Sequence, residues 1–407
     1  MEEKDQELKW RRTAIRLILK GLRPCDILKQ LPHGREWLRK WWHRFEQLGW
    51  DGLNNQARTP QHSPQAFDKP SRAVVLRVRR ALERRQIGLI GAKAVRQEII
   101  RQHLLNEVPS LATIKRWLHE AGLTHAAAPV LPNAYYPQPD WLIGKVLHAC
   151  DWLARYLEGG EKVFIFHTID ARTRAVSQTI STNKTTATVR QHLLRTWHTL
   201  GLPHHLQLDN DAAFNGGERT ARRCGAIVRL CLYLGIEIIF VPPGEPNRNG
   251  VVERVNGLWA SQFWDRHHFS SLAHVLRKQT VFTDWYAHDY YPPALDGLTP
   301  AQMHRRVPKL KLSRQQIRAM PDSLPITAGR IHFVRRVAGD GTISFLGESW
   351  KVGRGLAYQY VWATVITHCR RLEIYHQRSE RAAWRMVKTV DYELEETVSR
   401  LRPEYKR

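Results

Sequence analysis

The sequence predicts a multidomain α/β protein with helical units at the N-terminus, a mixed-sheet core in the middle and a small β-barrel near the C-terminus. Amphipathic helical patterns fill the first part of the chain, and hydrophobic strand-like runs alternate with helical ones in the middle. Short strands separated by glycine-containing turns follow near the C-terminus. The length of 407 residues allows two to four domains, each with its own core. We place the domains at residues 1–55, 70–123, 138–308 and 325–380.

The chain is strongly basic, with a formal net charge of +25. Residues 1–140 hold 25 Lys and Arg against 14 Asp and Glu, whereas residues 141–308 hold 19 against 14. Such a surplus favours a phosphate backbone as the partner and predicts salt-sensitive binding. No apolar run approaches the roughly 20 residues of a membrane span, and the polar N-terminus is unlike a secretory signal. Five scattered cysteines fit a reducing cytosol, so we expect a cytoplasmic protein with no membrane partner.

Three helices are expected in residues 1–55. An apolar face that includes Ala14 and Ile18 ends at Gly21, a short helix follows Pro24, and a third helix runs over Arg35–Leu48. A short helix, a tight turn and a basic, aromatic third helix favour a homeodomain-like helix-turn-helix unit. An ordinary three-helix bundle would give the same pattern. The candidate DNA contacts on the third helix are Arg35, Arg39 and Lys40.

A second helical set is expected in residues 70–123. Its last helix begins at Ser110 and stops at Gly122, which are typical helix-boundary residues. Apolar side chains fall on one side of this helix, whereas Lys115 and Arg116 face outward as candidate DNA contacts. Two helix-turn-helix units in tandem would read a longer DNA segment than one unit.

The middle of the chain predicts a mixed sheet flanked by helices. We expect strands over residues 144–151, 163–170 and 175–181, a helix over 185–200 and a short strand that ends at Asp209. A helix over 217–234, a strand over 236–241 and a helix after Pro246 follow. Residues 327–376 are strand-like again, with glycine turns, and this pattern predicts the small barrel.

Three carboxylates are placed where such a fold would bring them together. Asp151 and Asp209 each follow a predicted strand, and Glu253 lies about one turn into the helix after Pro246. Carboxylates in this arrangement can hold two Mg²⁺ or Mn²⁺ ions about 3.5–4 Å apart for in-line phosphoryl transfer. We take these three as the catalytic and metal-binding residues. Asp170 also ends a strand, but the residues after it favour a hairpin turn.

The motifs around these carboxylates resemble a known family. The order Asp151, then Asp209-Asn-Asp-Ala-Ala-Phe214, then Asn249-Gly-Val-Val-Glu253-Arg-Val-Asn256 is similar to the retroviral-type integrase core. It resembles bacterial insertion-sequence transposases of the Asp-Asp-Glu class more closely, over nearly the whole chain. The resemblance implies a ribonuclease-H-like catalytic core with Asp151, Asp209 and Glu253 as the metal-binding triad. It also implies Mg²⁺-dependent hydrolysis at element ends and transfer of the freed 3′-hydroxyl to target DNA.

Further expectations follow from this resemblance. The partners would be double-stranded DNA ends and target, and synapsis of two ends would need at least a dimer. Lys184, Arg248 and Arg254 lie near the expected active edge and are candidate DNA contacts.

Two departures from the family pattern leave alternatives open. Asp211 stands where the family usually has glycine, and 43 residues separate Asp209 from Glu253, more than the commonest spacing. Asp211 could be another metal ligand, or its charge could weaken metal binding. A catalytically inactive, domesticated DNA-binding relative and a metal-dependent nuclease are the alternative functions.

Overall fold

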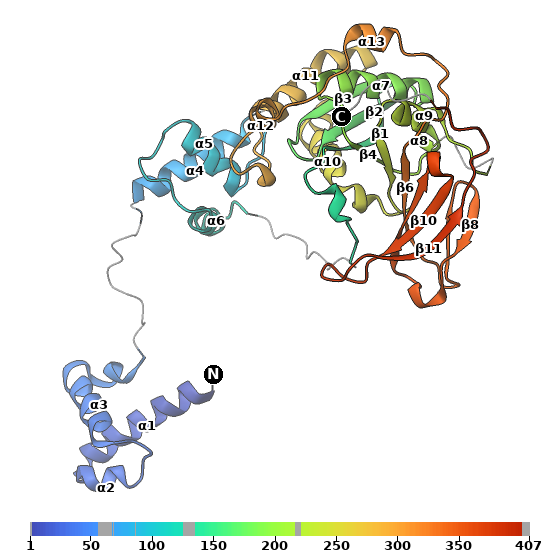
Figure 1. The fold of residues 1–407 in the computed structure, drawn as a ribbon. Coiled ribbons are helices and arrows are strands. Elements are labelled where there is room, and N and C mark those ends of the chain that lie inside the picture. Colours follow the sequence, from blue (N-terminus) through green and yellow to red (C-terminus); the bar gives the residue numbers. More distant parts are fainter. Residues whose placement is uncertain are drawn as a thin grey trace. The chain divides into compact units, whose positions relative to one another are not determined.

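The computed structural model describes residues 2–55, 67, 69–85, 87–124, 135–215 and 221–400 (Figure 1). The chain divides into two compact units, Met1–Phe67 and Asp68–Arg407. The expected helices and strands are present in both units, with the differences given below.

The smaller unit consists of α1 (Glu2–Leu19), α2 (Pro24–Leu28), α3 (Arg35–Leu48) and a final 3-10 turn. The three helices lie where the sequence predicted them. Ala14, Ile27 and Leu38 are buried between them, so the unit has its own hydrophobic core. Arg11 is also buried; it donates to the Leu53 carbonyl at 3.0 Å and its guanidinium lies 3.8 Å from the centre of the Trp41 ring.

The second helical set is α4 (Lys69–Glu83), α5 (Ala92–Arg101) and α6 (Leu111–Glu120). The expected serine start of α6 is confirmed, because Ser110 Oγ accepts a hydrogen bond from the Thr113 amide at 3.2 Å. This set belongs to the same compact unit as the sheet. The backbone N–H of Gly88 donates to Gln262 Oε1 at 3.2 Å and so links the α4–α5 connection to a helix of the core.

The larger unit is built on one mixed sheet of nine strands in the order β11-β10-β9-β6-β5-β4-β1-β2-β3. Strands β1, β2 and β3 form antiparallel neighbours, β4, β5 and β6 run parallel to β1, and β9, β10 and β11 are again antiparallel. A separate hairpin of β7 and β8 completes the strands. The strands are β1 (Leu147–Tyr156), β2 (Lys162–Asp170), β3 (Val176–Ser181), β4 (His205–Leu208), β5 (Glu237–Phe240), β6 (Arg330–Arg336), β7 (Thr342–Phe345), β8 (Glu348–Lys351), β9 (Tyr360–Ile366), β10 (Arg371–His376) and β11 (Arg385–Asp391).

Helices cover both faces of the sheet. Phe166 of β2 packs on the face that carries α7 (Thr186–Thr199), α8 (Ala212–Asn215) and α9 (Ala226–Tyr233). Ile165, the preceding residue, packs on the opposite face with α10 (Gly250–Gln262) and α11 (Leu272–His288). This alternation is what a strand with both faces buried requires. Two short helices, α12 (Pro300–Arg306) and α13 (Arg314–Arg318), lead to the C-terminal strands.

The C-terminal strands differ from the separate small barrel predicted over residues 325–380. Strand β6 pairs parallel with β5, with Ile238 opposite Ile331 and Phe240 opposite Phe333. The strands β6, β9, β10 and β11 therefore extend the core sheet instead of closing on themselves. The reason is that β5 would otherwise present an open, apolar edge, and β6 satisfies its backbone groups. The predicted boundary between core and barrel is corrected accordingly.

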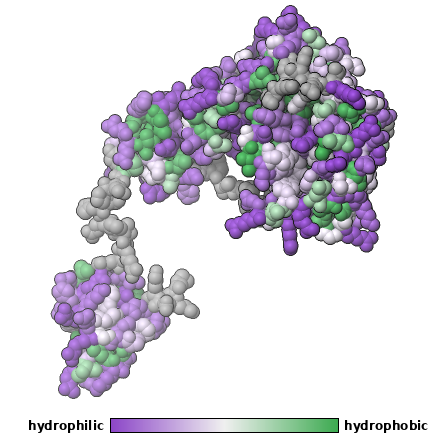
Figure 2. Space-filling view, in the orientation of Figure 1, coloured by the Kyte–Doolittle hydropathy of each residue, from purple (hydrophilic) through white to green (hydrophobic). Residues whose placement is uncertain are grey.

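The surface of the face shown in Figure 2 is mostly hydrophilic, with smaller hydrophobic patches between. None of the helices in the described part of the chain combines the length and the apolar character needed to cross a membrane.

Candidate active site

Asp151 lies on β1, and Asp209 directly follows β4, the neighbouring parallel strand. The pairing of the two strands ends with Ala149 opposite Gln207, two residues before Asp151 and Asp209 respectively. Side chains alternate along a strand, so Asp151 points to the same face as Ala149, which packs in the cluster beneath α10. The strand does not end at Asp151 as predicted, because β1 pairs with β2 along its whole length to Tyr156.

Glu253 lies in the first turn of α10, and the start of this helix is fixed to both aspartate-bearing strands. Asn249, immediately before α10, is buried and its Nδ2 donates to the Cys150 carbonyl at 3.2 Å. Its Oδ1 accepts a hydrogen bond from Gln207 Nε2 at 3.0 Å. Cys150, next to Asp151, and Gln207, two residues before Asp209, therefore fix the position at which the helix with Glu253 begins.

The three carboxylates form one electrostatic cluster. Burial above all, together with the negative charges of Asp209 and Glu253, raises the pKa of Asp151 to about 6, against hydrogen bonds from Trp152 N–H and Asn256 that lower it. The pKa of Asp209 is raised by burial and by the charge of Asp211, and burial raises that of Glu253. The site therefore concentrates negative charge that its surroundings do not fully compensate, a condition that a bound cation relieves.

A buried hydrogen-bond chain orients Asp151. Asn256 Nδ2 donates to Asp151 Oδ2 at 2.9 Å, and Asn256 Oδ1 lies 2.7 Å from His167 Nδ1. His167 is opposite Asp151 on β2, and its Nε2 lies 3.2 Å from Gln178 Oε1. Burial lowers the pKa of His167 to about 4, so the imidazole is neutral at pH 7. The three-residue spacing from Glu253 to Asn256 places both on one side of the helix. The hydrogen bonds that connect Asn256 to Asp151 and to His167 have no such local signal.

Asp211, the residue that departs from the family pattern, has a partner. Its Oδ2 lies 2.8 Å from Lys184 Nζ, and this ammonium group also lies 3.9 Å from the centre of the Trp152 ring. The Asp211 backbone N–H donates to Asp209 Oδ1 at 3.1 Å. Lys184 thus offsets part of the charge that Asp211 adds next to Asp209, and it lowers the pKa of Asp209.

A buried arginine of the C-terminal strands holds the segment after Asp209. Arg335 on β6 donates through Nη2 to Asn210 Oδ1 at 2.8 Å and through Nε to the Ser344 carbonyl at 2.8 Å. Asn210 Nδ2 in turn donates to the Val241 carbonyl at the end of β5. Sequence reasoning missed this residue. The available signal was an arginine within an otherwise apolar strand, which requires buried partners.

A tyrosine of the same strands holds the loop before α10. The hydroxyl group of Tyr360 on β9 donates to Glu245 Oε2 at 2.5 Å and accepts from Arg248 Nη2 at 3.0 Å. Arg248 also pairs with Glu245 at 3.0 Å, and its guanidinium lies 4.6 Å from the centre of the Tyr136 ring. Both segments that carry the candidate catalytic residues Asp209 and Glu253 are thus anchored by C-terminal strands.

The donor set fits a hard divalent cation, because three carboxylates supply the oxygen ligands that Mg²⁺ and Mn²⁺ prefer. Within the described residues no group of three or more His, Cys, Asp or Glu side chains is arranged to hold a metal ion. Asp151 instead accepts hydrogen bonds from Asn256 and from Trp152 N–H. The cluster is electrostatically coupled, and the three carboxylates would have to converge on a bound cation.

Asp170, the alternative to Asp151, is a turn residue. Its carboxylate accepts from the Arg172 amide at 2.8 Å and from Thr173 Oγ1 at 2.7 Å. In the β1–β2 pairing Asp170 lies opposite His148, three residues before Asp151 on β1. The predicted hairpin role is confirmed.

The candidate DNA contacts lie in different surroundings. Six of the eight side chains are exposed on helices: Arg35, Arg39 and Lys40 on α3, Lys115 and Arg116 on α6, and Arg254 on α10. Lys184 and Arg248 are half-buried and already paired within the protein, so contact with phosphate would compete with these ion pairs.

Comparison with known proteins gives one local match and several structural similarities. Residues 234–300, which include β5, α10 and Glu253, match the family model described as integrase core domain. The catalytic core domain of the HTLV-2 integrase, solved with magnesium, is 20% identical, covers 40% of this chain and 98% of its own, and gives a TM-score of 0.30.

Two further solved structures are similar over parts of this chain. The simian T-cell lymphotropic virus intasome in complex with a PP2A regulatory subunit matches at 16% identity over 73% of this chain and 95% of its own, with a TM-score of 0.36. The catalytic core domain of the BIV integrase matches at 19% identity over 40% of this chain and 95% of its own, with a TM-score of 0.30. The local family match therefore identifies an integrase-type core segment around Glu253.

Proposed function

We propose that the protein is a transposase or integrase that hydrolyses a phosphodiester bond at DNA element ends and joins the freed 3′-hydroxyl to target DNA. The observation that carries this proposal is the placement of three carboxylates on neighbouring elements: Asp151 on β1, Asp209 directly after β4, and Glu253 in the first turn of α10. Asn249, just before α10, bonds to Cys150 and Gln207 of these two strands. Such a concentration of acids in a chain of net charge +25 suits a cation-dependent reaction on a polyanion. The integrase core match over residues 234–300 supports it.

Each residue of the site has a defined part in this proposal. Asp151, Asp209 and Glu253 would together hold the divalent ions. Bound Mg²⁺ or Mn²⁺ ions neutralise the charge that develops on the attacking and leaving oxygens of the phosphodiester. Asn256 and Trp152 N–H orient the Asp151 carboxylate, and Asn249 fixes the start of the helix that carries Glu253.

The remaining parts of the proposal concern the DNA. The helical sets at residues 1–55 and 70–123 would act as helix-turn-helix units that read the element ends, since both present exposed cations on their third helix. Holding two ends together would require at least a dimer. We place the enzyme among the bacterial insertion-sequence transposases of the Asp-Asp-Glu class, acting in the cytosol or nucleoid where its DNA lies.

The test is a matched set of acid-to-amide variants. Asp209→Asn and Glu253→Gln should each lower Mg²⁺-dependent nicking of DNA that carries the coding region and its flanks by about a thousandfold or more. DNA binding without metal should be retained. Glu161→Gln, an exposed acid in the β1–β2 turn, is the control and should nick normally.

Three outcomes would contradict the proposal in different ways. Full activity of either triad variant with Mg²⁺ would show that the site is wrongly assigned. Salt-sensitive DNA binding without any metal-dependent nicking by the unaltered protein would indicate a non-catalytic DNA-binding relative. Nicking without any joined product would indicate a nuclease.

A further inference from the structure

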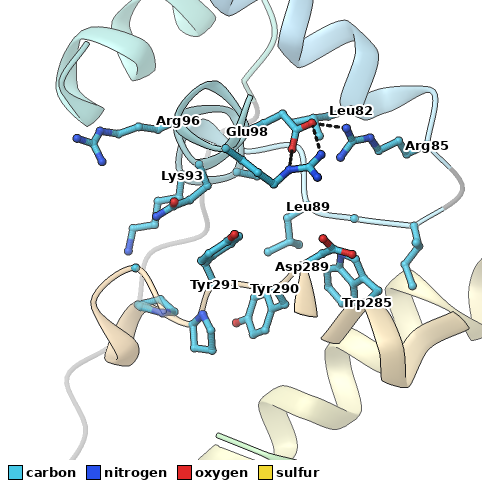
Figure 3. Close-up of a pocket in the computed structure, with 18 of the residues that line it drawn as sticks. Leu82, Arg85, Leu89, Lys93, Arg96, Glu98, Trp285, Asp289, Tyr290 and Tyr291 are labelled. Atoms are coloured by element: carbon cyan, nitrogen blue, oxygen red, sulfur yellow. Dashed lines mark hydrogen bonds and ion pairs between the residues drawn. The ribbon is translucent and has the colours of Figure 1, made fainter. Parts of the chain in front are cut away.

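A cavity of about 550 Å³ lies beside α10, between the second helical set and the segment that follows α11. Its lining comes from α4, α5 and their connection on one side, and from Trp285 to Gly297 on the other (Figure 3). Arg254, the residue directly after Glu253, also lines it. The cavity is therefore next to the helix that carries a candidate catalytic residue.

One wall of the cavity is held by a buried ion-pair network. Glu98 on α5 is buried, and its carboxylate pairs with Arg101 at 2.8 Å and with Arg85. Figure 3 shows Arg85 pointing toward Glu98 at the upper side of the cavity. The single carboxylate of Glu98 balances only one of these two cations, so the network stiffens the wall and leaves net positive charge on this side of the cavity.

Three other cations remain available to a ligand. Lys93 and Arg96 on α5, and Arg254 on α10, line the cavity, and in the described part of the chain none of them forms an ion pair. Lys93 and Arg254 are exposed, and Arg96 is half-buried. Asp289 and Asp296 are exposed on the facing rim. The cavity thus combines a cationic side with two isolated carboxylates.

The opposite wall is aromatic. Tyr290 and Trp285 are largely buried, with ring centroids 5.5 Å apart, and Tyr291 is more exposed and lies facing Lys93 (Figure 3). Leu89 projects between the two sides and is 37% exposed. Flat apolar faces opposite cations are the combination with which proteins bind single-stranded nucleic acid, by stacking bases and pairing phosphates.

The size of the cavity selects among DNA conformations. A B-form duplex, whose major groove alone is about 12 Å wide, is too large to enter a space of 550 Å³. A nucleotide or two of an unpaired strand would fit. The carboxylates on the rim can accept hydrogen bonds from amino groups on base edges.

We propose that this cavity holds unpaired nucleotides of the DNA strand next to the candidate active site. Tyr291 stacks a base, Lys93 and Arg96 hold the phosphates, and Arg254 leads the strand toward Glu253. This deepens the proposed function, because an unpaired strand beside the scissile phosphate gives the catalytic carboxylates access to the backbone.

Binding of a labelled single strand of about eight nucleotides to the full chain tests this. The measurement is made with a chelator and no metal, so it does not depend on the chemistry. The double variant Lys93→Ala/Arg96→Ala should weaken binding about tenfold. It should also lose one to two phosphate contacts, so the slope of log K against log salt concentration should become less negative by about 0.7 for each lost contact. Tyr291→Ala should weaken binding about tenfold, while Tyr291→Phe, which keeps the ring, should bind normally.

The control is Arg77→Ala/Arg80→Ala, which removes the same charge from exposed positions of α4 outside the cavity. It should retain single-strand affinity. The proposal is overturned if the cavity variants bind normally, if the control loses as much affinity, or if duplex binding falls equally. If nicking is never observed but the cavity variants lose single-strand binding, the proposed function fails and this site stands.

Discussion

The two basic flanks of the chain, both expected from the sequence to be accessory domains, are built into the molecule in opposite ways. Met1–Phe67 forms a compact unit by itself. The C-terminal strands instead join the core sheet through the pairing of β6 with β5. One flank is an independent module, and the other is part of the core sheet.

The physical difference lies in which hydrophobic faces remain to be covered. In the N-terminal unit Ile15, Ile27 and Leu53 are fully buried within three helices, so the unit needs no other surface. The C-terminal strands share one continuous core cluster with the sheet, which extends from Trp197 on α7 to Tyr392 after β11. Separating them would expose the apolar cluster and the edge of β5.

The difference also has a functional side. Arg335 and Tyr360, both from C-terminal strands, bond to the segments that carry Asp209 and lead to Glu253. Under the proposed function, the N-terminal unit would change DNA affinity, whereas the C-terminal strands would change the geometry of the candidate active site.

The largest expected effect comes from removing each flank in turn. Truncation after Leu324 should abolish cooperative unfolding and nicking, because it removes β6 and opens the core cluster. Deletion of residues 1–67 should change the melting temperature of the remaining chain by no more than about 2 °C. Independent units contribute separately to stability, so the loss of one leaves the other unchanged. Calorimetry and nicking assays on both variants measure this. A stable and active protein truncated after Leu324 would show that the C-terminal strands are not needed by the core sheet.

A smaller effect is expected from Arg335→Met. The variant leaves Asn210 Oδ1 and the Ser344 carbonyl without their buried donor, which should cost about 2–4 kcal/mol of unfolding free energy. Metal-dependent nicking should fall about 10- to 100-fold because Asp209 loses its support. Amide hydrogen exchange should become faster in residues 207–211.

Arg229→Met is the matched control for this experiment. Arg229 is also partly buried and pairs with Glu396, but it contacts neither catalytic segment. It should lose stability without faster exchange at residues 207–211. Equal loss of nicking in both variants would mean that Arg335 acts only through overall stability.

The smallest effect is a pH dependence within the core. Burial lowers the pKa of His192 to about 3 and that of His167 to about 4, from 6.5. Below pH 6.5 the unfolded chain binds protons that the folded state does not, so stability is lost as the pH falls toward 4. Each histidine contributes about 1.4 kcal/mol per pH unit in this window.

The difference between His192→Gln and the unaltered protein isolates this contribution. Asp151, with its pKa raised to about 6, titrates in the same window with the opposite sign, so total stability alone is ambiguous. Urea unfolding at several pH values should show a shallower loss for His192→Gln. His268→Gln, at the surface, should keep the original slope. Parallel slopes for all three proteins would contradict the prediction.

Local patterns sufficed to predict most of the elements, and the assignment of the three carboxylates stays a prediction. The helix over Arg35–Leu48, the Ser110 cap and the Asp170 turn each depend on neighbouring residues, and all three are present as expected. The helix expected over residues 217–234 is shorter, Ala226–Tyr233, and residues 216–220 lie outside the described part.

Pairings between distant strands could not be predicted in the same way. The extension of β1 beyond Asp151 depends on its antiparallel partner β2, and the fate of the C-terminal strands depends on β5. The roles of Arg335, Tyr360 and His167 depend on partners 89 to 125 residues away in sequence. No local pattern indicates such partners.

The sequence by itself determined the kinds of element, the basic character and the order of Asp151, Asp209 and Glu253, because these follow from short-range periodicity and composition. Only the tertiary structure decided that the C-terminal strands belong to the core sheet and hold the loops beside the candidate catalytic residues. The reason is that strand pairing and buried hydrogen bonds join residues far apart in the chain, and their free energy arises only once the sheet has formed.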